Sequence, residues 1–61
     1  MPYVSIRVAG KLTKEQKQKI AHGVTEVIFE ATSKPKESVL IFIDEVGRDN
    51  IAKSGVLMED M

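Results

Sequence analysis

The stretch that decides the fold is SVLIFIDEV, residues 38–46. Its residues from Val39 to Ile43 are apolar without a break, which indicates a β-strand that is buried on both of its faces. A single helix covers only one face of a small sheet. The sequence therefore predicts that another copy of the chain covers the second face.

An amphipathic helix is predicted before this strand. The segment TKEQ, Thr13 to Gln16, has the pattern of a capping box, in which the threonine hydroxyl accepts from the backbone of Gln16 and the Gln16 side chain reaches back. Pro35 disfavours helix in the residue before it, so the helix should end near Thr32 or Ser33. Six apolar residues recur at helical spacing and should face the core: Ile20, Ala21, Val24, Val27, Ile28 and Ala31.

A first strand is predicted from Pro2 to Val8. One face of it would carry Val4, Ile6 and Val8, and the other would carry Tyr3, Ser5 and Arg7. A turn at AGKL, residues 9–12, leads into the helix, and Gly10 is free to take an unusual backbone angle there. Two strands joined by a long helical crossover should be parallel, with a right-handed connection.

The residues after the second strand contain turn signals at Asp49-Asn50 and Ser54-Gly55. The segment GVLM, residues 55–58, should form a short strand or hairpin, and we expect it to pair with a neighbouring chain rather than with its own. The predicted fold class is α+β. Residues 1–61 should form one domain, a β-α-β protomer with two parallel strands, one helix and a short C-terminal strand or hairpin, assembled into an oligomer.

The composition excludes several classes of protein. The chain has 61 residues, with 9 Lys and Arg against 9 Asp and Glu, and this balance gives no general attraction to nucleic acid or to an anionic membrane. It has no cysteine and one histidine, so neither a disulfide nor a metal site of Cys or His ligands is expected. Its apolar runs are too short for a membrane span. A cytoplasmic protein is the default.

Pro2 is the first candidate for chemistry. Proline is tolerated at the first position of a strand, and on composition alone that structural explanation is favoured. If Met1 is removed, however, Pro2 becomes a free secondary amine. Met-Pro is a sequence from which aminopeptidases remove methionine. A dry pocket and nearby cations would disfavour the charged form of this amine, and an amine tuned near neutrality is a competent general base.

Charged residues offer weaker candidates. Lysines cluster near the start of the helix, and Glu26 and Glu30 lie near its end, the reverse of what the helix dipole favours. Most of these charges are interpreted as solvated surface, while Lys11 is best placed to attract an anionic ligand. Asp44 and Glu45 point to opposite faces of a strand, so we interpret them as a polar strand end.

Several motifs together resemble 4-oxalocrotonate tautomerase and its small relatives. They are the initial Met-Pro, LTKEQKQKI (12–20), SKPKESVLIFIDEV (33–46) and DNIAKSG (49–55). The resemblance implies a hexamer, a trimer of dimers, that needs neither metal nor cofactor. It also implies that the amino-terminal proline, Pro2 here, moves a proton between carbons of a small enol or keto-acid substrate.

The residues expected to bind substrate depart from this family. Its best-studied members hold a dicarboxylate with two arginines and a phenylalanine, and on a gapless reading these positions are Leu12, Leu40 and Ile51. Lys11 and Arg48 lie nearby in sequence and are candidate replacements. We therefore do not predict that this chain acts on the family's dicarboxylate substrate. The alternative function is a catalytically degenerate oligomer that serves as a binding or structural protein on the same fold.

Overall fold

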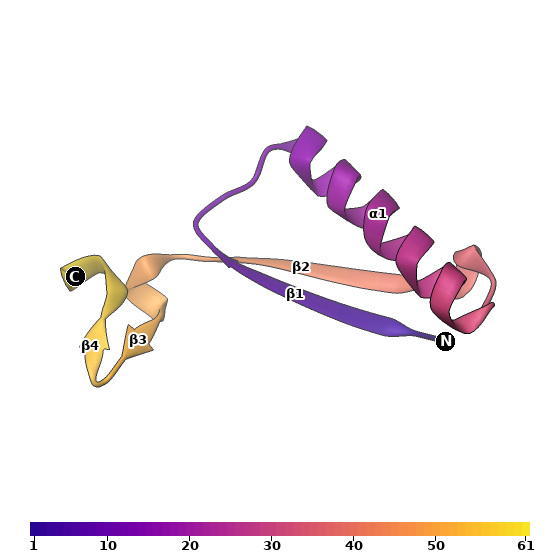
Figure 1. Cartoon of the computed structure of the whole chain (residues 1–61). Helices are drawn as coiled ribbons and strands as arrows, with labels where there is room; N and C mark the ends of the chain where they lie inside the picture. Colours follow the sequence, from indigo (N-terminus) through magenta and orange to yellow (C-terminus); the bar gives the residue numbers. More distant parts are fainter.

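The computed structural model describes residues 1–61, and its elements follow the predicted β-α-β order (Figure 1). Strand β1 spans Tyr3–Ala9, helix α1 spans Lys14–Thr32 and strand β2 spans Leu40–Val46. The short strands β3, Ala52–Lys53, and β4, Val56–Leu57, follow. Three single 3₁₀ turns complete the chain, at Lys36–Ser38, Arg48–Asn50 and Met58–Asp60.

Strands β1 and β2 are parallel, as predicted, with Tyr3 opposite Leu40 and Ala9 opposite Val46. Both strands begin later than expected. Pro2 precedes β1 because it has no N–H for the ladder, although its carbonyl oxygen accepts a hydrogen bond from the Leu40 amide at 3.0 Å. Ser38, predicted to open the second strand, instead ends a 3₁₀ turn.

The predicted capping box of α1 is confirmed, since the Thr13 hydroxyl accepts from the Gln16 amide and the Gln16 side chain accepts from the Thr13 amide. The helix ends where Pro35 requires, with Ser33 as a left-handed cap. The predicted core stripe is correct except at its edge. Val27 is 62% exposed and Ala31 is also exposed, because both lie on the flank of the helix rather than over the sheet.

The helix lies over one face of the sheet only (Figure 1). The other face, called here the open face, carries Tyr3, Leu40 and Phe42, of which Tyr3 is 68% and Phe42 53% exposed. No residue in the chain is buried. The accessible surface is 4886 Å², against about 4,000 Å² for a folded monomer of this mass. The radius of gyration, 14.7 Å, likewise exceeds the roughly 10.5 Å of a compact domain of this length. The single chain is therefore more extended than a compact monomer of its length.

The C-terminal hairpin corrects one prediction. Strands β3 and β4 pair with each other in antiparallel fashion, whereas we expected residues 55–58 to pair with a neighbouring chain. The reason is local: Ser54 and Gly55 take positive φ values of 54° and 81°, as a two-residue hairpin turn requires. No helix of the structure is long and apolar enough to cross a bilayer.

Candidate active site

Pro2 is half-buried at the end of the sheet where both strands begin. Its only close backbone partner is Leu40, whose amide donates to the Pro2 carbonyl. Because Met1 precedes it, the Pro2 nitrogen is part of a peptide bond and has no basicity. Met1 itself is exposed. Removal of this one exposed residue is all that is needed to turn the nitrogen into an amine.

Aromatic and aliphatic side chains occupy the open face at the end of the sheet where the strands begin. The rings of Tyr3 and Phe42 meet edge to face, with centroids 6.4 Å apart. Leu40 lies opposite Tyr3 in the register and is 40% exposed. Sequence reasoning did not select Tyr3 or Phe42, although the alternation of β1 already places Tyr3 on the face away from the helix. This end of the open face is therefore apolar.

The other candidates lie at the opposite end of the sheet. Lys11 follows the end of β1, and Arg48 and Ile51 follow the end of β2 (Figure 1). Seven strand residues separate this end from Pro2, which corresponds to about 20 Å. One chain therefore does not bring Lys11, Arg48 or Ile51 to its own Pro2.

A groove of about 360 Å³ occupies this far end, and the half-buried Ile51 lines it. Neither Lys11 nor Arg48 does. The cation that lines the groove is Arg7, which sequence reasoning also missed. Its guanidinium is 3.7 Å from the Asp44 carboxylate, and both side chains are well exposed, so this ion pair leaves Arg7 free to meet another anion.

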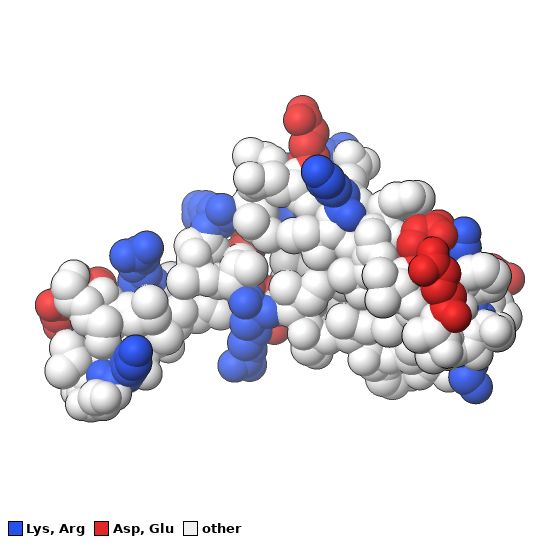
Figure 2. Space-filling model, in the orientation of Figure 1, with Lys and Arg blue, Asp and Glu red and all other residues white.

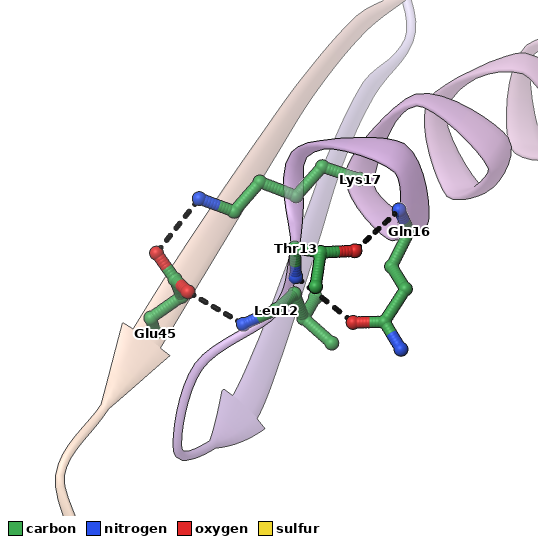
Figure 3. A network of polar contacts seen from close by, with 5 residues as sticks. All are labelled: Leu12, Thr13, Gln16, Lys17 and Glu45. Carbon is green, nitrogen blue, oxygen red and sulfur yellow. Dashed lines mark hydrogen bonds and ion pairs between the residues drawn. The ribbon is translucent and has the colours of Figure 1, made fainter.

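The loop that carries Lys11 and Leu12 is tied to β2 by Glu45 (Figure 3). One carboxylate oxygen of Glu45 accepts from the Leu12 amide at 2.7 Å, and the other lies 2.8 Å from the Lys17 ammonium. The hydrogen bonds from Lys17 and from the Leu12 amide lower the pKa of Glu45 below its ordinary value. Glu45, interpreted from sequence as a polar strand end, thus fixes the backbone position of the loop, while Asp44 points to the opposite face, as predicted.

Charge elsewhere on the surface is mixed. On the face shown in Figure 2, positive and negative side chains are interspersed and form no continuous basic patch. No group of three or more His, Cys, Asp or Glu side chains is placed to hold a metal ion.

Comparison with known proteins gives one consistent result. The family model described as "Tautomerase enzyme" matches residues 2–61. The 2-hydroxymuconate tautomerase of Bacillus subtilis (strain 168) is 36% identical over 61 residues, covering 100% of this chain and 98% of that protein. A probable tautomerase of Bacillus cereus is 35% identical over 60 residues, with 98% of both chains covered. The solved structure of YwhB, a homologue of 4-oxalocrotonate tautomerase, superposes with a TM-score of 0.91 at 35% identity, covering 98% of each chain.

Proposed function

The chain belongs to the tautomerase family, and we propose that it is a cytoplasmic, cofactor-independent tautomerase whose general base is Pro2 after removal of Met1. The observation that carries this proposal is the extent of the family match, which begins at Pro2 and runs to the last residue. Pro2 also lies at the open end of the sheet, where an amine would be accessible to a small molecule.

The proposed reaction is a proton transfer between two atoms of one substrate. The Pro2 amine takes a proton from an enol oxygen or from a carbon next to a carbonyl, which leaves an enolate or a dienolate. The protonated amine then returns the proton to a different carbon, so the enzyme ends as it began. A dry pocket around Pro2 would disfavour the charged form of the amine and keep part of it available as a base.

The proposed substrate is an enol or keto acid with at most one carboxylate. A dicarboxylate is commonly held by bidentate arginine contacts, and Leu12 and Leu40 stand at the two positions where the resemblance places them. The name of the B. subtilis relative gives 2-hydroxymuconate as its substrate, and this compound serves as the dicarboxylate for comparison. Phenylenolpyruvate serves as the monocarboxylate.

We further propose that a neighbouring copy completes each site, within a hexamer built as a trimer of dimers. Pro2 and the groove that Ile51 lines lie at opposite ends of one sheet, so a site that uses both must draw them from two chains. The excess surface and the uncovered open face support assembly. Lys11, Arg48 and Arg7 are then the cations from which a second copy could supply a carboxylate contact.

The decisive experiment combines intact mass with activity. Protein expressed in its native form should have the mass of the chain without Met1 and should convert phenylenolpyruvate to its keto form. Pro2→Ala, which also exposes an amine, should lose at least about 100-fold in kcat/KM, within the range that general-base catalysis contributes. Inserting a lysine between Met1 and Pro2, which prevents removal of the methionine, should abolish activity without altering the fold. Retained Met1 in the native protein, or activity unchanged by Pro2→Ala, would refute the proposal.

The alternative is a binding or structural oligomer without catalysis. The observation that favours it is that leucine stands at positions 12 and 40, where the resemblance places the two substrate-binding arginines. It predicts that protein lacking Met1 turns over neither phenylenolpyruvate nor 2-hydroxymuconate, while remaining assembled.

A further inference from the structure

The groove of about 360 Å³ at the far end of the sheet, called here the Ile51 groove, has the lining of a small-molecule site. Its apolar lining residues are Val8, Ala9, Val46, Ile51 and Ala52, and its two polar ones are Arg7 and Asn50. Ligand sites commonly combine a mostly apolar surface with a few polar groups. The lining therefore suits a ligand with an apolar body and a polar group that Arg7 can bind.

Arg7 is the only charged residue that lines the Ile51 groove. Its Nε lies 3.7 Å from a carboxylate oxygen of Asp44, which is too far for a hydrogen bond. The guanidinium makes no hydrogen bond within the chain, although it has five N–H donors that can hold a carboxylate in bidentate fashion. The polar group that Arg7 suits best is therefore a carboxylate.

A second hollow, of about 490 Å³, shares Arg7 and Asn50 with the groove. Asp44 and Glu45 also line this second hollow, and their negative charges would repel an anion. No Asp or Glu lines the Ile51 groove. An anion that binds Arg7 should therefore enter the groove rather than the second hollow.

Asn50 reaches the groove through the turn that follows β2. Its amide donates to the Gly47 carbonyl oxygen at 2.9 Å, and a Cβ at Gly47 would collide with the Asp49 carboxylate, so the turn in this form requires glycine. The Asn50 side chain makes no hydrogen bond within the chain. Its amide group is therefore available to donate to an oxygen of a ligand.

We propose that Arg7 binds the single carboxylate of the substrate, with Asn50 as a second donor, and that the apolar lining of the Ile51 groove holds the substrate's apolar body. The inference rests on the proposed function, because the reacting carbons must meet Pro2 of a neighbouring copy. It selects Arg7 among the candidate cations. It also specifies the substrate class, a monocarboxylate with an apolar group such as the phenyl ring of phenylenolpyruvate, since a second carboxylate would have no cation in the groove.

The first test separates binding from catalysis in the kinetics. Arg7→Leu should raise KM for phenylenolpyruvate at least about tenfold while kcat stays within about twofold, because the carboxylate contact is made equally in the substrate and in the transition state. Arg7→Lys keeps the charge without the bidentate geometry and should recover part of the loss. The control Lys34→Leu removes a cation that makes no ion pair and lines no hollow, and it should change neither value. An unchanged KM for Arg7→Leu would overturn the assignment.

The second test needs no turnover. In an NMR titration, the original chain should bind phenylacetate, which has no enol to react, at least about ten times more tightly than the neutral 2-phenylacetamide. Arg7→Leu should lose this difference. Pro2→Ala should keep it while losing turnover, so a failure of the general-base proposal and a failure of this one give different results. Equal affinities of the original chain for the two compounds, or no binding of either, would overturn the proposal.

Sedimentation equilibrium of Arg7→Leu separates ligand binding from assembly. An exposed ion pair contributes little to stability, and the Arg7–Asp44 pair is exposed, so this variant should keep its fold and its oligomeric state. Circular dichroism checks the fold. A variant that is folded but dissociates would place Arg7 in a contact between copies, and the proposal would then be wrong.

Discussion

The Leu40 amide donates a hydrogen bond to the Pro2 carbonyl at 3.0 Å. This bond joins the backbone of Pro2, the proposed base, to that of Leu40, which stands at a position where the resemblance leads one to expect an arginine. The chain therefore combines the amino-terminal proline of its family with an apolar neighbour, and the choice of substrate should follow from that combination.

Restoring a cation beside Pro2 should shift the substrate preference. We expect Leu40→Arg to raise kcat/KM for 2-hydroxymuconate by about tenfold, the effect of one charge-assisted hydrogen bond worth about 1.4 kcal/mol. The value for phenylenolpyruvate should change little or fall. Leu57→Arg, which adds the same group in the hairpin, is the control and should alter neither value. Equal effects of the two substitutions would show that Leu40 does not face the substrate.

The open face of the sheet should be an association surface. Phe42→Ser removes a large apolar side chain that the single chain leaves about half exposed, so we expect the dissociation constant of the assembly to rise at least about tenfold, as for a central interface aromatic. Phe29→Ser is the control, because the Phe29 ring lies on the helix beneath the Lys36 ammonium, 5.0 Å away. Sedimentation of the two variants side by side gives the comparison. If Phe42→Ser associates as tightly as the control, the open face is not covered by a copy.

The Glu45 carboxylate should make the folding stability of the chain depend on pH in the acidic range. Its pKa is lowered from 4.5 in the folded chain by Lys17 and the Leu12 amide, so its stabilisation is complete above about pH 4.5 and is lost as pH falls through the lower folded value. Glu45→Gln should therefore lower the urea midpoint of unfolding at about pH 7. The midpoint of this variant should also fall less steeply than that of the original chain between about pH 6 and pH 3.

The measurement needs a fixed protein concentration, because assembly adds to apparent stability. The stability of the Glu45→Gln variant should still fall somewhat with falling pH, because the hydrogen bond from Lys36 also lowers the pKa of Glu26. Glu59→Gln removes a carboxylate that makes no ion pair and should keep the original slope. A Glu45→Gln variant with the full original slope would contradict the assignment.

Local signals in the sequence were sufficient for the protomer. The Thr13–Gln16 capping box, the restriction before Pro35 and the apolar run of residues 39–43 each act over a few neighbouring residues, and each correctly indicated its element. The prediction for residues 55–58 was wrong for a reason that is also local: the left-handed pair Ser54-Gly55 closes a hairpin within the chain.

The candidate site was less predictable because it depends on distances between segments. Sequence proximity to the family's arginine positions suggested Lys11 and Arg48, yet the groove beside Ile51 is lined by Arg7, which the parallel register brings to that end. Likewise, nothing local to Glu45 reveals that it binds Leu12 and Lys17, which lie 33 and 28 residues earlier in the chain.

The lack of any buried residue in the single chain also bears on how quickly the protein acquires its structure. A chain without a core of its own gains most of its apolar burial on meeting other copies, so its refolding should include a step whose rate rises with protein concentration. At low abundance, newly made chains would spend longer unassembled, with α1 and the open face exposed to proteases. The amount of protein made would then govern its lifetime in the cell.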